Sequence, residues 1–130
     1  MTIDSSLMDG LLEEASRSPR LRMNLDLRNS SADGSQRMLN ALLPGTRLPV
    51  HRHTATSETV AVLRGRMKEI FYDDSGRVTD TFLLSAADGC VGLSIPCGRW
   101  HTVEVLEPTV ILEMKDGAYE PLAESDILCV

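Results

Sequence analysis

The chain has 130 residues and a formal net charge of −6, with 42% hydrophobic and 25% charged residues. These values are typical of a soluble globular protein with one core. The acidic balance disfavours binding to nucleic acid or to an anionic membrane, because both attract basic surfaces. The sequence has no run of about eighteen apolar residues, so we expect no transmembrane helix.

The N-terminal segment predicts a short helix over residues 4–17. Asp4, Ser5 and Ser6 can cap it, and acidic side chains lie opposite the apolar ones. The apolar residues recur at the three-to-four spacing of a helix: Leu7, Met8, Leu11, Leu12 and Ala15. Pro19 follows shortly and ends the pattern. The segment has no basic region ahead of an apolar stretch, so a secretory signal is not expected.

From Leu21 onward the pattern indicates short strands. In "RLRMNLDLR" the apolar residues alternate with polar ones, which is the period of a half-buried strand. The segment "QRMLNALLP" fits either a strand or a short helix. A hairpin turn is expected at residues 73–76, and further short strands follow to about residue 115. Many short strands with turn signals between them predict an antiparallel sandwich or barrel. We therefore divide the chain into a helical extension, residues 1–20, and a single β domain, residues 21–130.

The three cysteines, Cys90, Cys97 and Cys129, are an odd number without CxxC spacing. A disulfide framework needs paired cysteines and an oxidising compartment. We therefore expect reduced thiols in a cytoplasmic protein. Cys90 and Cys97 are interpreted as small buried core residues rather than as nucleophiles or thiolate ligands.

The histidines suggest a metal site. His51 and His53 are two residues apart, so on a strand both side chains project from the same face. Glu58 is an odd number of residues beyond His53, so it can join them only if residues 54–57 turn and reset the register. The third histidine, His101, follows a Pro-x-Gly turn. Three neutral imidazoles and a carboxylate suit Mn, Fe, Ni, Co or Zn.

Two segments resemble the motifs of the cupin superfamily. The first runs Gly45, five residues, His51, one residue, His53, four residues, Glu58, six residues, Gly65. The second contains Gly89, then "IPCGRWH", with a valine at position 105 where the motif has asparagine. The resemblance implies a cupin domain, a double-stranded β-helix or jelly-roll barrel, with metal ligands His51, His53, Glu58 and His101. Glu58 either binds the metal directly or orients an imidazole.

A narrower resemblance is to the WbuC-type cupin metalloproteins. It is carried by "QRMLNALLPGTRLPVHRHTATSETVAVLRG", "FYDDSGRV", "IPCGRWH" and "EMKDGAYEPLAESD". This family is associated with surface-polysaccharide gene clusters and has no settled reaction.

Other residues are candidates for ligand binding or proton transfer. Arg37 lies in the family's "QR" signature, and a guanidinium suits a carboxylate or phosphate. Glu113 and Lys115 share strand parity, so they form either an acid–base pair inside the barrel or a surface pair. Tyr119 either covers the barrel mouth and contacts the ligand or simply packs on the barrel. For Arg22 we expect a solvated charge or a turn hydrogen bond.

These observations leave several functions open. The first is metal-assisted isomerase, epimerase or lyase chemistry on a sugar or nucleotide-sugar, with Glu58 or Glu113 moving a proton. An Fe(II) dioxygenase is a variant of it. The second is a non-catalytic module that binds a sugar or carboxylate. We expect a homodimer with a small-molecule ligand, because exposed sheet edges need covering.

Overall fold

The computed structural model describes residues 1–129 of the chain. These residues contain one α-helix, α1, at Ser5–Ser16, and a single-turn 3₁₀ helix at Glu124–Asp126. The strands are β1 (Arg22–Asp26), β2 (Arg37–Leu42), β3 (Val50–His51), β4 (Glu58–Arg64), β5 (Arg66–Tyr72), β6 (Val78–Ser85), β7 (Gly92–Ile95), β8 (Trp100–Val105), β9 (Thr109–Lys115) and β10 (Ile127–Leu128). Val130, the last residue of the expected β domain, lies outside the described residues.

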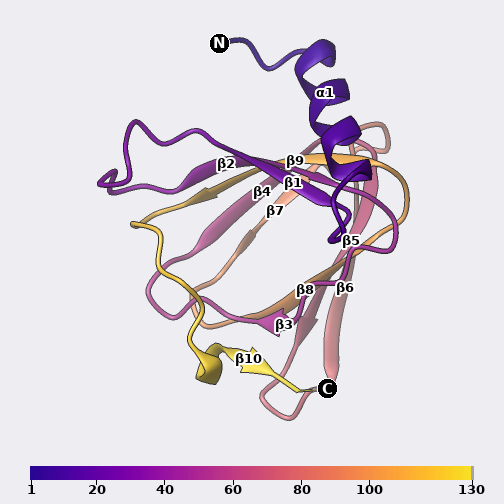
Figure 1. Cartoon of the computed structure of the whole chain (residues 1–130). Coiled ribbons are helices and arrows are strands. Elements are labelled where there is room, and N and C mark those ends of the chain that lie inside the picture. The colour runs from indigo at the N-terminus through magenta and orange to yellow at the C-terminus, as the bar shows by residue number, and fades with distance from the viewer. Residues whose placement is uncertain (130) are drawn as a thin grey trace.

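The strands form two five-stranded antiparallel sheets that face each other (Figure 1). We call them the first sheet, in the order β1-β2-β9-β4-β7, and the second sheet, in the order β10-β3-β8-β5-β6. Sequence neighbours β4 and β5 belong to different sheets, so the chain passes repeatedly between the two layers. The all-β prediction with a short N-terminal helix is confirmed, and "QRMLNALLP" forms a strand rather than a helix.

The turn between β4 and β5 depends on Gly65, the last glycine of the first motif. Its φ is 91°, in the left-handed region that favours glycine. A Cβ at this position would overlap the carbonyl oxygen of Pro108 and the Thr109 side chain. Gly65 is therefore required both by its backbone angle and by the close approach of another chain segment.

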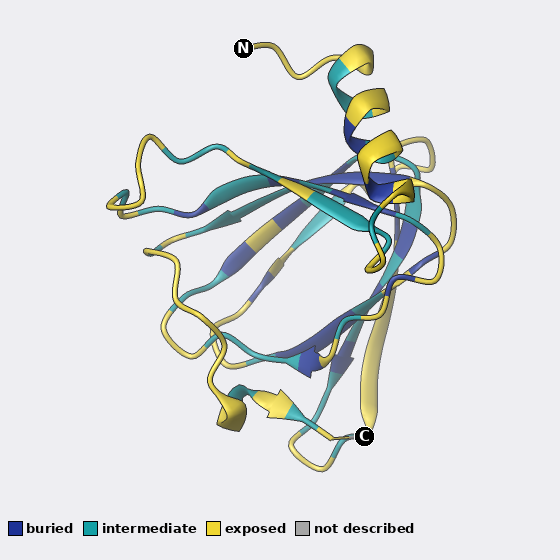
Figure 2. Cartoon of the chain, in the orientation of Figure 1, coloured by how far each residue is buried: buried dark blue, intermediate teal, exposed yellow. Residues whose placement is uncertain are grey.

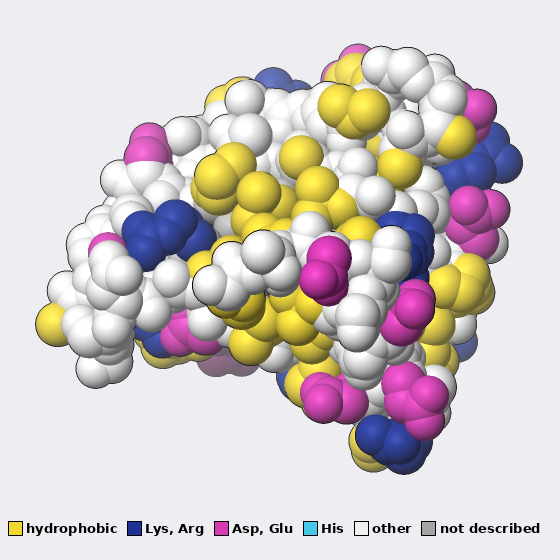
Figure 3. Space-filling model, turned by 90° about the horizontal axis from the view of Figure 1, so that it is seen from above, with side chains coloured by type: hydrophobic (Ala, Val, Ile, Leu, Met, Phe, Trp, Pro, Cys, Tyr) yellow, Lys and Arg dark blue, Asp and Glu magenta, His cyan; other side chains and the backbone are white. Residues whose placement is uncertain are grey.

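Helix α1 covers the outer face of the first sheet. The Asp4 side chain accepts a hydrogen bond of 2.9 Å from the Leu7 backbone N–H and so caps the helix. Leu11 and Ala15 are buried from the helix side, and they pack with three residues of β2 and β9: Leu39, Ala41 and Val110. Viewed from above, hydrophobic side chains gather beside the helix in the middle of this face (Figure 3). The helix and the sheet thus share a hydrophobic cluster.

A second hydrophobic cluster fills one end of the space between the sheets. Leu42 and Val60 of the first sheet contribute to it, and Met67 and Leu84 of the second sheet are fully buried there. Because side chains alternate along a strand, β2 sends Leu39 and Ala41 to the helix and Leu42 to the interior. The first sheet is therefore covered on its outer face by α1 and on its inner face by the second sheet.

Strand β6 is the exposed edge of the second sheet. It pairs with β5 through the expected hairpin at residues 73–76, where Gly76 has a φ of 85°. Its residues are exposed from Val78 to Leu83, as Figure 2 shows, and only Leu84 and Ser85 are buried.

The prediction that Cys90 and Cys97 are small buried core residues is wrong. Both are exposed and free, as is Cys129. Cys90 precedes β7 and Cys97 lies in the tight turn before β8, so both occupy loops that face solvent. Among residues 1–129, no helix has the length and apolar character needed to cross a membrane.

Candidate metal centre

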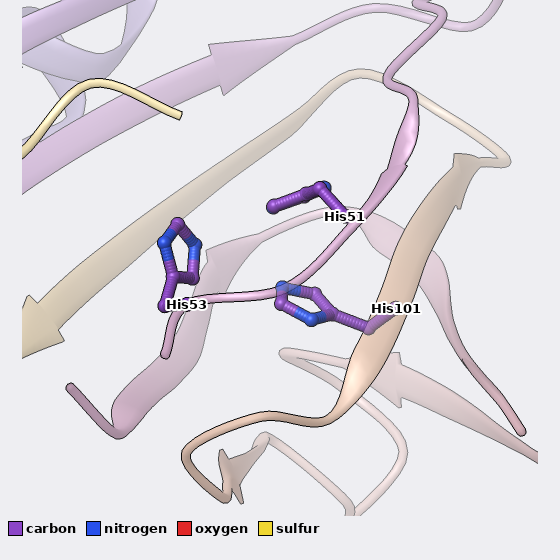
Figure 4. A group of neighbouring side chains, drawn as sticks. All are labelled: His51, His53 and His101. Carbon is purple, nitrogen blue, oxygen red and sulfur yellow. The ribbon is translucent and has the colours of Figure 1, made fainter. Parts of the chain in front are cut away.

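Three histidines converge between the two sheets. His51 ends β3, His53 follows it by two residues, and His101 lies on β8, directly opposite His51 in the strand pairing. The ring centroids of His51 and His101 are 4.3 Å apart, and those of His51 and His53 are 5.1 Å apart. The three imidazoles point toward one common space (Figure 4). One ring nitrogen from each lies within 4.8 Å of the others, a spacing that lets the three surround a single ion.

Backbone carbonyls orient two of these rings. The Nδ1 of His51 lies 2.8 Å from the Pro49 carbonyl oxygen, and the Nδ1 of His101 lies 2.9 Å from that of Arg99. Since a carbonyl oxygen only accepts, each Nδ1 carries the proton and donates. The tautomer thus leaves both Nε2 lone pairs free, which is the arrangement found in metal-binding histidines.

The histidines are held in the neutral form. Burial, together with the neighbouring His101, lowers the pKa of His51 from 6.5 to about 4. Burial and the positive charge of Lys115 lower the pKa of His53 to about 3. Burial also lowers the pKa of His101. Neutral imidazoles are the form that binds a metal ion, so the site needs no proton release from these rings at neutral pH.

Glu58 completes the donor set expected from the sequence. A bend at Thr54 and Ala55 resets the register, so Glu58 begins β4 with its side chain turned inward. Its Oε2 lies 3.5 Å from His53 Nε2 and 3.6 Å from His101 Nε2. This oxygen is buried and has no hydrogen-bond partner within the described residues. Burying a carboxylate oxygen without a hydrogen-bond donor costs free energy, and a cation bound among the histidines would offset that cost. The residues therefore fit a divalent metal.

Glu113 and Lys115 lie inside the barrel, on the same face of β9. Both line the cavity that contains the histidines. The Asn40 side chain donates a 3.4 Å hydrogen bond to Glu113 Oε2. Burial and the negative charge of Glu58 raise the pKa of Glu113 well above its ordinary value. Of the two arrangements left open by the sequence, the structure has the inward one.

Glu69 is a further buried acid that the sequence analysis did not identify. It lies on β5, its side chain is 1% exposed, and it lines the same cavity. Burial and the charges of Glu58 and Glu113 raise the pKa of Glu69. The sequence did carry a signal, because Glu69 falls between Met67 and Phe71 at the buried parity of its strand.

The cavity has a volume of about 210 Å³, so it admits a small molecule. Polar groups gather around the histidines, and apolar side chains such as Val60, Val103 and Ile111 form part of the wall. Arg20, Arg22 and Asn24 also line it. Arg22 is thus a partly exposed residue of the cavity wall, because the polar side of β1 borders the cavity while its apolar side packs beneath the helix.

Two of the predicted binding residues, Arg37 and Tyr119, do not line the cavity. Arg37 pairs with Asp33 at 3.0 Å and donates to the Leu27 carbonyl oxygen, so it braces the loop before β2. Tyr119 is 52% exposed, and the guanidinium of Arg28 lies over its ring. Tyr119 lines a neighbouring pocket that shares Asn24 and Met38 with the histidine cavity. The structure brings together His51, His53, Glu58, His101, Glu113 and Lys115, and leaves Arg37 and Tyr119 outside.

Comparison with known families gives one sequence match. A model described as "Domain of unknown function (DUF6016)" matches residues 3–84, more than half of the chain. The chain belongs to the DUF6016 family. The matched region contains His51, His53 and Glu58 and ends before His101. A search of functionally curated proteins finds no match to this DUF6016 member.

Solved structures similar to this DUF6016 member show its fold. The capsular polysaccharide assembling protein CapF from Staphylococcus aureus has a TM-score of 0.66 at 20% identity, over 80% of this chain and 30% of CapF. An oxalate oxidase in complex with the substrate analogue glycolate has a TM-score of 0.65 at 14% identity, and the match covers 82% of this chain and 56% of the oxidase. KdgF from Halomonas sp. has a TM-score of 0.62 at 14% identity, and the match covers 78% of this chain and 84% of KdgF. The DUF6016 chain has the cupin fold, and it spans only part of the length of CapF and of the oxidase.

Proposed function

We propose that this chain is a metal-dependent cupin that acts on a small polar molecule of the sugar or nucleotide-sugar class. The observation that carries the proposal is the meeting of three neutral histidines and a buried Glu58 with a second polar pair, Glu113 and Lys115, in one cavity. The four residues His51, His53, His101 and Glu58 would hold a divalent transition metal. Glu58 acts either as a ligand or as the acceptor that orients an imidazole.

The inward position of Glu113 and Lys115 supports catalysis over binding alone. A metal-assisted isomerisation, epimerisation or lyase reaction also needs a group that moves a proton beside the metal site. When bound, the metal would polarise a carbonyl or hydroxyl oxygen of the ligand. Glu113 is oriented by Asn40, so its carboxyl can exchange a proton with a ligand atom while Lys115 balances the charge that develops.

The sugar class has two supports. The cavity is small and lined by both hydrogen-bonding and apolar groups, as a sugar ring with its polar edge and apolar face requires. The similar fold of CapF, a capsular polysaccharide assembling protein, agrees with the WbuC-type resemblance of the sequence. On these grounds we place the protein in surface-polysaccharide metabolism. The cytoplasmic location expected from the cysteines is part of the same proposal.

The first test measures metal in protein purified without a histidine tag. We expect about one equivalent of a transition metal for each site in the wild-type chain, and its loss in His51→Ala and His101→Ala. Arg77→Gln, a substitution of an exposed arginine in the β5–β6 turn, is the matched control and should keep the metal. Protein that holds no transition metal, and takes up none when one is supplied, would refute the proposal.

The second test screens ligands by thermal stability. Nucleotide-sugars, deoxysugars and small dicarboxylates are added to the metal-loaded protein. Binding stabilises by about 2.7 kcal/mol when the ligand is at a hundred times its Kd, which raises the melting temperature. Stabilisation by dicarboxylates alone would reject the sugar class. Sugar binding without any change in the sugar on prolonged incubation would leave a metal-dependent binding module.

A further inference from the structure

The polar side of β1 forms one wall of the cavity. Arg22 and Asn24 share strand parity, and both line the cavity together with Arg20, which precedes the strand. The alternate residues Met23 and Leu25 pack in the hydrophobic cluster under helix α1. The direction of Arg22 is thus set by the packing of the other face of β1 beneath the helix.

These two arginines lack a negative partner. Elsewhere in the chain Arg28, Arg37 and Arg52 each pair with an aspartate within 3.1 Å. Among residues 1–129, neither Arg20 nor Arg22 has a carboxylate within 4.0 Å, and neither side chain forms a hydrogen bond to protein. The two positive charges also lie near each other, and burial together with Arg20 lowers the pKa of Arg22.

The position of Arg22 makes this arrangement costly without a ligand. Its side chain is half-buried, so part of its hydration is lost. A partly buried guanidinium normally recovers this loss through charge-assisted hydrogen bonds to a carboxylate or phosphate. The acids of the cavity, Glu58, Glu69 and Glu113, all lie beyond ion-pair distance of it. A binding partner from solution is the remaining source of negative charge.

We propose that Arg20 and Arg22 form an anion-binding subsite of this cavity, so that the ligand carries a carboxylate or phosphate group. The planar guanidinium of Arg22 would donate two parallel hydrogen bonds to two anionic oxygens, with Arg20 adding a second positive charge at the entrance. The inference rests on the proposed function in one respect, namely that this cavity is the ligand site. It narrows the substrate class from polar molecules to acidic ones, such as a uronate or a sugar phosphate.

The subsite can be observed without knowing the substrate. The full chain is labelled with ¹⁵N, and the arginine Nε–Hε resonances are followed by NMR while malonate or inorganic phosphate is added at constant ionic strength. The titration is run on protein as purified and again after chelation of metal. We expect a saturable shift of the Arg22 resonance, assigned by its loss in Arg22→Gln, in both preparations.

Variants separate the subsite from general effects of salt. Arg22→Gln should weaken the binding of the anion about tenfold or more, as expected for losing charge-assisted hydrogen bonds. Arg22→Lys keeps the charge but not the planar fork, and should weaken it less. Arg77→Gln is the matched control and should bind as the wild type does. A shift with malonate alone indicates a carboxylate ligand, with phosphate alone a phosphorylated one, and with both a shared anion site.

The absence of a saturable shift at Arg22 with both anions would overturn the subsite, as would unchanged binding by Arg22→Gln. Failure of the proposed function is read separately. It shows as missing metal or missing sugar stabilisation, whereas malonate and phosphate binding after chelation depends on neither.

Discussion

The backbone N–H of Gly98 donates a 2.8 Å hydrogen bond to the carbonyl oxygen of His53. These residues belong to the two separate histidine motifs, so this bond ties the loop that carries His53 to the turn that leads into His101. Gly98 has a φ of 82°, which only glycine adopts readily.

The first prediction concerns this link. Gly98→Ala should destabilise the protein by about 1 kcal/mol or more, because alanine is strained at positive φ. It should also weaken metal binding, since the two motif loops would shift. Gly10→Ala is the matched control: Gly10 lies in α1 with open space around it, so the change should stabilise by about 1 kcal/mol. Urea unfolding measures the stability of both variants, and competition with a chelator measures their metal binding. Equal changes in stability for Gly98→Ala and Gly10→Ala would contradict the argument.

The second prediction concerns Glu58. Glu58→Gln keeps the shape of the side chain but removes the negative charge near His53 and His101. We expect metal affinity to fall about tenfold to a hundredfold, measured by competition with a chelator. Glu107→Gln, at an exposed position, should have no effect. Unchanged affinity in Glu58→Gln would remove this residue from the metal site.

The third prediction is a pH dependence of stability set by Glu69. Burial raises its pKa well above 4.5 in the folded protein, while the unfolded chain ionises near 4.5. Between these two values the folded state binds more protons, so stability falls as the pH rises through this window. In metal-free protein, Glu69→Gln should therefore be more stable than the wild type at pH 8, by at least about 1 kcal/mol, the equivalent of one pKa unit. The difference should shrink toward pH 4.5.

Denaturant titrations at several pH values check this expectation. Glu107→Gln serves again as the control, because an exposed carboxylate should give a difference that does not vary with pH. A constant gap between Glu69→Gln and the wild type from pH 4.5 to pH 8 would show that Glu69 stays ionised in the fold.

The fourth prediction separates bracing from ligand binding at Arg37. Its ion pair with Asp33 is partly buried, so Arg37→Gln should cost about 1 kcal/mol of stability. Ligand affinity should be unchanged, because the side chain lies outside the cavity. Isothermal titration with whichever sugar stabilises the protein tests this, and a large loss of affinity would restore Arg37 as a binding residue.

The fifth prediction concerns assembly. An exposed edge strand that pairs with its own copy generates a two-fold dimer, and β6 offers eight residues with Phe82 and Leu83 exposed. We expect a homodimer in sedimentation analysis. Leu83→Lys should shift it to monomers, whereas Val91→Lys, at an exposed position outside the strand, should not. A monomeric wild type would refute this prediction.

Much of the fold was predictable from local patterns. Residues 4–17 gave the helix to within a residue, and the alternation of "RLRMNLDLR" marked β1. The metal site was also predictable, because His51, His53 and Glu58 lie within eight residues of one another in the sequence and only His101 comes from a distant segment. What alternation cannot tell is which face of a strand is the inside when both faces are covered.

The errors follow from that limit. Alternation alone does not show that Arg22, on the polar and partly exposed face of β1, borders a cavity whose other wall carries the histidines. Glu69 shares the buried parity of its strand, but no histidine or second acid at motif spacing marks it as part of the site. The exposure of Cys90 and Cys97 depends on the path of loops, which small-residue preferences do not determine.

The shared cluster of α1 and the first sheet has a consequence for how the N-terminal segment should be regarded. Ala15 and Leu39 are both fully buried in this cluster, so deleting residues 1–17 would expose the outer face of the first sheet to water. Without the helix, the apolar face of β1 would no longer be buried, so its packing would no longer direct Arg22 toward the cavity. Helix α1 itself does not line the cavity, but it holds β1 in the position that forms the cavity wall. A chain that lacks residues 1–17 should therefore bind anions more weakly while its histidines still bind metal.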